Sequence, residues 1–152
     1  MGLILFVCTG NLCRSPMAAG LLRQRLAQEG LADRYRVDSA GVWAVAGRPA
    51  SENAVIVMAE RGIDISDHRS RPITAYDVHE ADLILVMGRE HKQALEQTWP
   101  QYEWKIYRLS EMVHKKKDIR DPYGGSLDEY CRCADILEDY IQRGFRRILD
   151  LA

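Results

Sequence analysis

The residues with the clearest chemical potential lie in one short loop near the N-terminus, which reads Cys8-Thr9-Gly10-Asn11-Leu12-Cys13-Arg14-Ser15. A cysteine thiolate is a nucleophile, and the planar guanidinium of Arg14 can hold two oxygens of a phosphoryl group at once. If the loop leads into a helix, its backbone N–H groups and the positive end of the helix dipole also attract an anion. We therefore predict that Thr9 to Arg14 cradle a phosphate and that Cys8, held as a thiolate by the same positive groups, attacks it from beneath.

The composition of the loop weighs against other interpretations. Gly10 and Asn11 are the residue types that best tolerate left-handed backbone geometry, which a ring of inward-pointing amides requires. A nucleotide-binding loop needs Gly-Lys followed by Ser or Thr, and the sequence contains no such tripeptide. Cys8 and Cys13 could instead be small buried residues beside an ordinary turn. The full spacing from Cys8 to Ser15 favours phosphoryl or arsenate chemistry.

The segments on either side of the loop have the patterns of a strand and a helix. Residues 3–7 are an uninterrupted apolar run, which suits a strand buried on both faces of a parallel sheet. Ser15-Pro16 suits the start of a helix, and apolar residues follow at helical spacing from Met17 to Leu26. The loop is therefore expected to connect the carboxyl end of a strand to the N-terminus of a helix.

Further along the chain, strand and helix patterns alternate. We predict strands at residues 36–39, 83–87 and 104–107, and helices at residues 51–61, at residues 90–99 and, as one long helix, from Ser126 through Ile148. This alternation predicts an α/β fold with a single domain over residues 1–152. We expect a three-layer sandwich with a central, mostly parallel four-stranded sheet and helices on both faces. Ligands of such folds bind beyond the carboxyl ends of the strands, where the Cys8 loop lies.

The composition also limits the partners. With 21 basic and 22 acidic residues the formal net charge is −1, so no overall field favours nucleic acid or an anionic membrane. No segment approaches the roughly 18 apolar residues of a membrane span, and residues 3–7 lack the length and charged start of a signal peptide. We therefore expect a cytoplasmic protein with free thiols on its four cysteines. We also expect no metal or cofactor, because the thiolate, the loop amides and the guanidinium supply the nucleophile and the charge that metals provide elsewhere.

The sequence resembles the low-molecular-weight protein tyrosine phosphatases over nearly its whole length. The segment from Val7 to Ala18 is similar to the signature that this family carries near its N-terminus. Further similarities follow in the same order along the chain: Asp38-Ser39-Ala40-Gly41, His68-Arg69-Ser70-Arg71 and Asp121-Pro122-Tyr123. The resemblance implies an enzyme that hydrolyses phosphotyrosine through a cysteinyl-phosphate intermediate. It also implies tyrosine-phosphorylated proteins as substrates and a cognate tyrosine kinase as a candidate partner.

The same resemblance implies roles at the leaving group. Asp121 would be the general acid that protonates the leaving oxygen, and Tyr123 would be an aromatic wall of the substrate cleft. Ser15 would hydrogen-bond the sulfur of Cys8 and help it to leave in the second step. From the residues alone, Asp121 before proline is an ordinary turn residue and Ser15 could simply cap a helix.

A supporting network is implied as well. Asn11, Ser39 and His68 would form buried contacts that hold the strained backbone of the loop. In the family, the pair equivalent to Cys8 and Cys13 can form a reversible disulfide that protects the nucleophile. Cys131 and Cys133, by contrast, are two positions apart on a predicted helix and point in different directions, so we expect packing or surface thiols there.

Three other functions share this kind of loop. An arsenate reductase would need further cysteines to carry a disulfide away from Cys8, and only Cys131 and Cys133 are available. A protein-arginine phosphatase of the same family has threonine after the loop asparagine and often phenylalanine after Asp-Pro, where this chain has Leu12 and Tyr123. A phosphate-binding protein would need neither the thiol nor the acid. We therefore predict phosphotyrosine as the substrate, with phosphoarginine as the main alternative.

Overall fold

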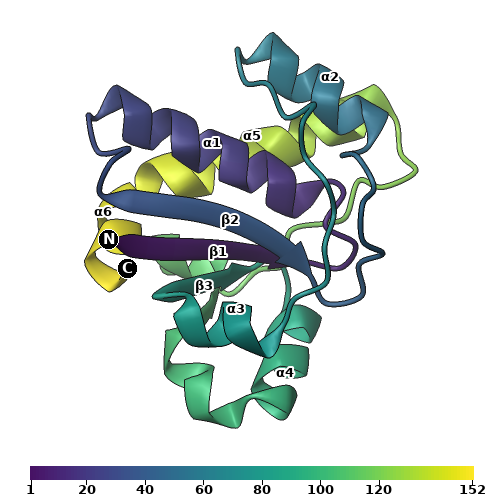
Figure 1. Ribbon diagram of the computed structural model, residues 1–152. Coiled ribbons are helices and arrows are strands. Elements are labelled where there is room, and N and C mark those ends of the chain that lie inside the picture. The colour runs from purple at the N-terminus through teal and green to yellow at the C-terminus, as the bar shows by residue number, and fades with distance from the viewer.

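A four-stranded sheet lies at the centre of the computed structural model, which describes residues 1–152 (Figure 1). Its strands are β1 (Gly2–Cys8), β2 (Tyr35–Gly41), β3 (Leu83–Val86) and β4 (Ile106–Arg108), in the order β2-β1-β3-β4. Every neighbouring pair is parallel, so the carboxyl ends of the strands share one edge. The predicted α/β sandwich is confirmed, and its sheet is wholly parallel. Cys8 pairs in register with Gly41, which brings two of the sequence motifs together at this edge.

The central strands are apolar because helices cover both faces of the sheet. Residues 4–8 and all of β3 are buried, as expected for interior strands of a parallel sheet. Ile4 and Phe6 belong to the larger hydrophobic cluster on one face, whereas Leu5 and Val7 belong to the smaller cluster on the other. Successive side chains of β1 therefore pack against the helical layers on opposite faces of the sheet.

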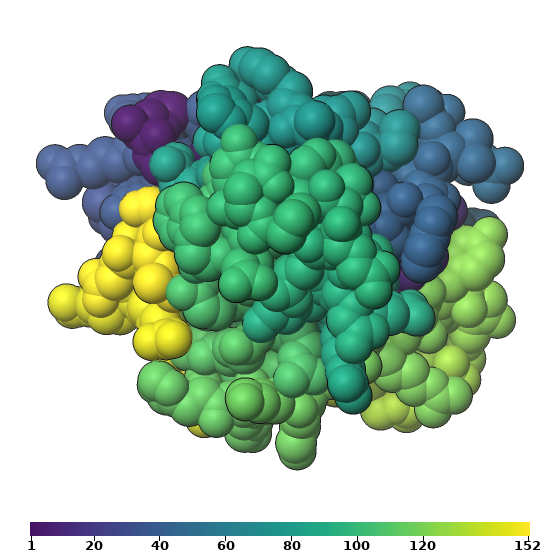
Figure 2. All heavy atoms as spheres, turned by 90° about the horizontal axis from the view of Figure 1, so that it is seen from below, coloured from purple at the N-terminus to yellow at the C-terminus, as the bar shows by residue number.

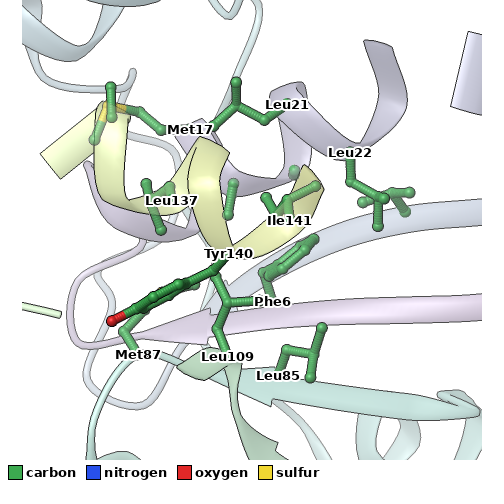
Figure 3. Close-up of a cluster of buried hydrophobic side chains, with 14 of the residues drawn as sticks. Phe6, Met17, Leu21, Leu22, Leu85, Met87, Leu109, Leu137, Tyr140 and Ile141 are labelled. Atoms are coloured by element: carbon green, nitrogen blue, oxygen red, sulfur yellow. The ribbon is translucent and has the colours of Figure 1, made fainter. Parts of the chain in front are cut away.

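The larger cluster lies beneath one helical layer. This layer consists of α1 (Arg14–Gln28), α2 (Glu52–Glu60), α5 (Leu127–Arg143) and α6 (Phe145–Leu151) (Figure 1). Figure 3 shows Phe6 and Leu85 of the sheet facing Met17 of α1 and Leu137 and Ile141 of α5. Full burial of one such side chain contributes about 2 kcal/mol. The contact of α1 with α5 and the sheet fixes the helix that begins in the phosphate loop.

The opposite layer is smaller. It contains α3 (Ala75–Glu80) and α4 (Arg89–Thr98), with Val78 and Leu95 buried against the sheet. Figure 2 views the molecule from the side of α4, and the chain from α3 onward covers the centre of the face that it shows. None of the helices in either layer has the length and apolar character needed to cross a membrane.

The predicted long C-terminal helix is wrong in one respect: it is divided at Gly144 into α5 and α6. A Cβ atom on Gly144 would lie 2.7 Å from the Cβ of Met112 and 3.0 Å from its carbonyl oxygen. Met112 belongs to η2 (Leu109–Val113), a 3₁₀ helix that packs against α5. The break therefore depends on a close approach between two distant segments, which helical periodicity does not reveal.

Two further segments differ from the sequence-based expectation. No helix was predicted over the six residues of α3, yet Thr74 and Asp77 form a capping box at the start of this helix. The predicted strand at residues 104–107 begins only at Ile106, because Pro100–Lys105 form the 3₁₀ helix η1. Proline at the first position of η1 is compatible with a helical turn. Both differences lie away from the phosphate loop.

Candidate active site

The phosphate loop, residues 8–15, continues directly from β1 and leads into α1 at Arg14. Its first part pairs with the segment after β2, where the amide of Trp43 donates to the carbonyl oxygen of Thr9 over 3.0 Å. A Cβ atom on Gly41 would lie 2.5 Å from that same carbonyl oxygen. Only glycine permits this close approach, which explains why the motif Asp38-Ser39-Ala40-Gly41 ends in glycine.

Asn11 is the left-handed residue of the loop, with φ 58°, and its side chain is fully buried. Its amide nitrogen donates to the hydroxyl oxygens of Ser15 (2.8 Å) and Ser39 (3.0 Å), and its amide oxygen accepts from the backbone of Arg71 (3.0 Å). These three contacts hold a backbone conformation that costs energy for any residue with a Cβ atom. Gly10, which we expected to be left-handed as well, has no positive φ.

His68 supports the loop from outside the cavity. Its Nε2 atom donates to the carbonyl oxygen of Asn11 over 2.7 Å. Burial lowers the pKa of His68, with a smaller opposing contribution from this hydrogen bond. The imidazole therefore acts at neutral pH as an uncharged donor. The structure thus brings together the loop-supporting residues that the family resemblance implied, Asn11, Ser39 and His68.

Ser15 lies inside the first turn of α1 and is fully buried, so it is not the cap of that helix. Its hydroxyl oxygen is 2.9 Å from the sulfur of Cys8. Because the same oxygen accepts from Asn11, the hydroxyl proton is free to point toward Cys8. A hydroxyl that donates to sulfur stabilises a thiolate.

Arg14 is almost fully buried, with 6% of its surface exposed. One terminal nitrogen donates to the carbonyl oxygen of Ile119 over 2.7 Å, and the other lies 3.5 Å from a carboxylate oxygen of Asp121. Its Nε atom is buried and has no partner. An unpaired buried donor on a charged group is unusual in a folded protein. The guanidinium is thus fixed by the protein on one edge and keeps donors available for an anion.

Asp121 and Asp118 have different environments in the segment before α5. Asp121 accepts from the backbone of Tyr123 over 3.1 Å, and its side chain is 46% exposed. Asp118 accepts from the backbone N–H of Arg89 (2.9 Å) and from the guanidinium of Arg108 (3.2 Å). Asp118 is therefore occupied in joining this segment to α4 and β4, whereas Asp121 can reach a bound molecule.

A cavity of about 160 Å³ unites the predicted chemical groups. It is lined by Cys8, Thr9, Gly10, Leu12, Cys13, Arg14, Asp121 and Tyr123. Tyr123 is 61% exposed. Ser15, Asn11, Ser39 and His68 are not in the lining, so their effect on a ligand must pass through the loop. No group of three or more His, Cys, Asp or Glu side chains in the chain is placed to hold a metal ion.

Sequence reasoning missed several residues next to the loop, among them Trp43, Ser51 and Tyr130. Trp43 is 64% exposed immediately after the backbone pairing with Thr9. Ser51 and Tyr130 place their hydroxyl oxygens 3.1 Å and 3.3 Å from the sulfur of Cys13. An aromatic residue soon after the Gly41 motif could have indicated the first, but no local pattern indicates contacts that span 38 and 117 positions.

The four thiols are unpaired, and their environments differ. Burial raises the pKa of Cys13, partly opposed by its contacts with Ser51 and Tyr130. Burial raises the pKa of Cys133 to about 12, whereas Cys131 on the same helix is partly exposed. Cys131 and Cys133 thus have different surroundings. No disulfide joins Cys8 to Cys13 in this structure.

A wholly parallel α/β sandwich, with a cysteine-arginine loop at its carboxyl edge and a carboxylate beside that loop, defines a class of cysteine-dependent phosphatases. Residues 3–149 match the family model described as "Low molecular weight phosphotyrosine protein phosphatase". The chain belongs to this family, and it is a phosphoric monoester hydrolase.

Relatives in the family carry two different names. The chain is 45% identical over 141 residues to the "Probable low molecular weight protein-tyrosine-phosphatase EpsP" of Ralstonia nicotianae, covering 93% of this chain and 89% of that protein. It is 40% identical over 141 residues to the "Protein-arginine-phosphatase" of Bacillus subtilis, covering 92% of both. A solved structure of the arginine phosphatase YwlE, a cysteine-to-serine mutant with a phosphorylated active site serine, has a TM-score of 0.91. The identity there is 38%, over 97% of this chain and 95% of that chain.

Proposed function

We propose that this phosphatase hydrolyses phosphotyrosine in proteins, with Cys8 as the nucleophile, Arg14 as the phosphate clamp and Asp121 as the general acid and base. The observation that carries the proposal is the convergence of these three side chains on one small cavity. Leu12 and Tyr123 line the same cavity and offer apolar and aromatic surface to a substrate ring.

In the first step, the Cys8 thiolate attacks phosphorus as the bond between phosphorus and the tyrosine oxygen breaks. Asp121 gives its proton to the departing oxygen, so tyrosine leaves as a neutral phenol. Arg14 and the loop amides hold the phosphoryl oxygens while the negative charge is redistributed. The product is a phosphate bound covalently to the sulfur of Cys8.

In the second step, water attacks the cysteinyl phosphate and Asp121 takes the proton of that water. The phosphorus–sulfur bond breaks and Cys8 leaves as a thiolate, to which Ser15 donates its hydroxyl proton in a hydrogen bond. Inorganic phosphate is released, and Asp121 is again protonated. The structure of the relative with a phosphorylated active site serine supports a covalent intermediate at this loop position.

The ion pair between Arg14 and Asp121 suggests how the acid is prepared. The guanidinium lies 3.5 Å from the Asp121 carboxylate. A bound phosphate competes for the guanidinium and adds negative charge beside Asp121. Substrate binding would thus release the Asp121 carboxyl group from Arg14, beside the oxygen to which it transfers a proton.

The choice between phosphotyrosine and phosphoarginine rests on the walls of the cavity. The guanidinium of phosphoarginine carries N–H groups that need acceptors when they are buried. Leu12 offers none, and the one carboxylate in the lining, Asp121, faces Arg14. A phenyl ring needs only apolar and aromatic contacts there. Phosphoarginine remains the second candidate, because a relative of comparable similarity is named a protein-arginine phosphatase.

The decisive experiment compares turnover of a phosphotyrosine peptide, a phosphoarginine peptide of matched sequence and arsenate with thiol reductant. We expect kcat/KM to be highest for phosphotyrosine, and arsenate not to be reduced. Leu12→Thr, which adds a hydroxyl to the wall, should shift the ratio of the two peptides toward phosphoarginine. A wild-type preference for phosphoarginine would replace the proposed substrate while keeping the mechanism.

We further propose tyrosine-phosphorylated proteins as the cellular partners, together with a cognate tyrosine kinase, and a cytoplasmic location. Four free thiols are typical of a reducing compartment. Arsenate reductase is disfavoured because Cys133 is buried with a raised pKa, which makes it a poor relay thiol. A purely phosphate-binding role is disfavoured because a binder needs neither Cys8 nor Asp121.

A further inference from the structure

His91 is a buried polar residue beside the phosphate loop that the mechanism above does not use. It lies in the first turns of α4 and is 1% exposed. Together with Thr9 and Arg14 it lines a polar cavity of about 620 Å³ that adjoins the phosphate cavity. Thr9 and Arg14, along with Asp121, are shared by the two cavities. His91 therefore approaches the phosphate loop from the side opposite α1.

A short chain of contacts connects His91 to Arg14. The Nε2 atom of His91 lies 2.8 Å from the hydroxyl oxygen of Thr9. A terminal nitrogen of Arg14 donates to that same oxygen over 3.4 Å. An arginine can only donate, so the threonine oxygen is the acceptor and its proton is free for His91. A neutral imidazole whose Nε2 accepts from Thr9 is consistent with both contacts.

The charge state agrees with this arrangement. Burial, followed by the charge of Arg14, lowers the pKa of His91 to about 4. The ring is thus neutral at the pH of the cell and can accept through one nitrogen. Asp118, Asp121 and Glu90 are the acidic groups near it, and Glu90 Oε1 is 3.9 Å from Nε2.

The other ring nitrogen of His91, Nδ1, is buried without a hydrogen-bond partner. An unpaired buried polar atom destabilises a fold, so an apolar side chain would suit this interior position better. The presence of histidine at this position is therefore explained by the hydrogen bond between its Nε2 atom and Thr9, and not by a contribution to stability. The only hydrogen bond that His91 makes through its side chain is the one to Thr9.

We propose that His91 is a positioning residue for phosphate binding: it orients the hydroxyl of Thr9, and Thr9 in turn holds the guanidinium of Arg14 in the plane that faces the phosphate. This inference deepens the proposed function, since it concerns the same site. The guanidinium is then fixed at two points, by the carbonyl oxygen of Ile119 and by Thr9. Arg14 can meet the phosphoryl group without first losing side-chain freedom.

The test measures the dissociation constant of inorganic phosphate as a competitive inhibitor, together with kcat and KM for an aryl phosphate. His91→Leu should weaken phosphate binding and lower kcat/KM by about tenfold, which corresponds to the loss of one hydrogen bond in a buried chain. His91→Gln, whose amide can reach the same hydroxyl, should restore most of the loss. Equal phosphate affinity in wild type and His91→Leu would overturn the proposal.

A matched control separates positioning from stability. Leu95→Ala removes a side chain that is equally buried on the same helix but belongs to a hydrophobic cluster that does not include Thr9. It should lower the unfolding midpoint at least as much as His91→Leu while leaving phosphate affinity unchanged. A comparable loss of phosphate affinity in Leu95→Ala would assign the effect to the helix as a whole and refute the role of His91.

A double-mutant cycle tests the route through Thr9. Thr9→Val removes the hydroxyl that connects the two residues, so His91→Leu should have almost no further effect on phosphate affinity in that background. Full additivity of the two changes would contradict the proposal. Phosphate affinity also separates this inference from the proposed function, because it can be measured even if phosphotyrosine proves not to be the substrate.

Discussion

The guanidinium of Arg14 and the carboxylate of Asp121 lie 3.5 Å apart, and this ion pair joins the phosphate loop to a segment more than a hundred positions later in the chain. Arg14 also binds the carbonyl oxygen of Ile119 in that segment. The clamp and the acid therefore lie side by side in the folded chain, and Arg14 contacts the segment that carries Asp121 at two points. Such preorganisation is a large part of electrostatic catalysis.

Arg14→Lys should consequently lose most of its activity although the charge is kept. A lysine ammonium is a single point and cannot contact the Ile119 carbonyl and two phosphoryl oxygens together. We expect kcat/KM to fall at least about 100-fold, from the loss of two hydrogen bonds to a charged group. Arg120→Lys, at an exposed guanidinium in the same segment, should change it less than about twofold. Similar values for both variants would make Arg14 a structural residue.

Cys8→Ser should abolish steady-state turnover while the phosphate cradle remains. A serine hydroxyl stays protonated beside Arg14 and is a far weaker nucleophile than a thiolate. We expect inorganic phosphate still to bind, and prolonged incubation with an aryl phosphate to add one phosphoryl group that is not released. Titration calorimetry and intact-protein mass spectrometry measure these two results. Turnover near the wild-type rate would exclude Cys8 as the nucleophile.

The four thiols should react with iodoacetamide at different rates. Alkylation needs the thiolate, and burial raises the pKa of both Cys13 and Cys133, the latter to about 12. We expect Cys8 to be alkylated first at pH 7 and to be protected by phosphate. The partly exposed Cys131 should follow, while Cys13 and Cys133 stay unmodified even at pH 9. Peptide mass spectrometry gives the order, and early labelling of Cys133 would contradict the burial argument.

The phosphate loop could be predicted because its chemistry is local. Cys8, Arg14 and Ser15 lie within eight consecutive residues between an apolar run and a helix pattern, so sequence spacing alone brings them together. The role of Asn11 was likewise recognisable, since its left-handed backbone is one that asparagine tolerates. By contrast, Gly10 was misjudged, because residue type permits a positive φ without requiring it.

The missed features depend on contacts between distant segments. His91 meets Thr9 across 82 positions, and on its own helix it has only the pattern of a core residue. Tyr130 likewise meets Cys13 across 117 positions. The break at Gly144 depends on Met112, and the short helix α3 buries only Val78 and so has little apolar periodicity. Local propensity cannot indicate such features, because the deciding partner is supplied by the fold.

The stability of the protein should fall in mild acid partly because of His91. Its pKa is lowered from 6.5 to about 4 by burial, so between these values the unfolded chain binds a proton that the folded chain does not. The free energy of unfolding therefore rises with pH in this window. It falls as the pH drops from about 6.5 through about 4, because protons bind to His91 more readily in the unfolded chain. A shift of this size corresponds to about 3 kcal/mol.

Urea denaturation of wild type and His91→Gln at several pH values measures this contribution. The glutamine variant does not titrate, so its free energy of unfolding should decline less than that of wild type between pH 7 and pH 4. When the free energies of unfolding of the two proteins are subtracted, the titration of most other groups cancels. The exceptions are Glu90, Asp118 and Asp121, which lie near the ring. Parallel curves for the two proteins would show that His91 titrates normally.

Asp121→Asn gives the sharpest test of the mechanism, because its effect should depend on the leaving group. An unassisted phenolate from tyrosine leaves slowly at neutral pH, whereas a nitrophenolate needs much less help from an acid. Asp118→Asn is the matched control: it removes a carboxylate from the same segment that is already occupied by Arg89 and Arg108. We expect Asp121→Asn to reduce kcat/KM for phosphotyrosine at least about tenfold more than for nitrophenyl phosphate. Asp118→Asn should instead affect both substrates to the same degree, because it changes the position of the segment and not the proton transfer.

The measurement is kcat/KM for a series of aryl phosphates of increasing leaving-group pKa. A plot of log kcat/KM against the leaving-group pKa should become steeper only for Asp121→Asn. If the two variants gave the same slope as wild type, Asp121 would not be the acid, and if the steeper slope belonged to Asp118→Asn, the roles of the two carboxylates would have to be exchanged.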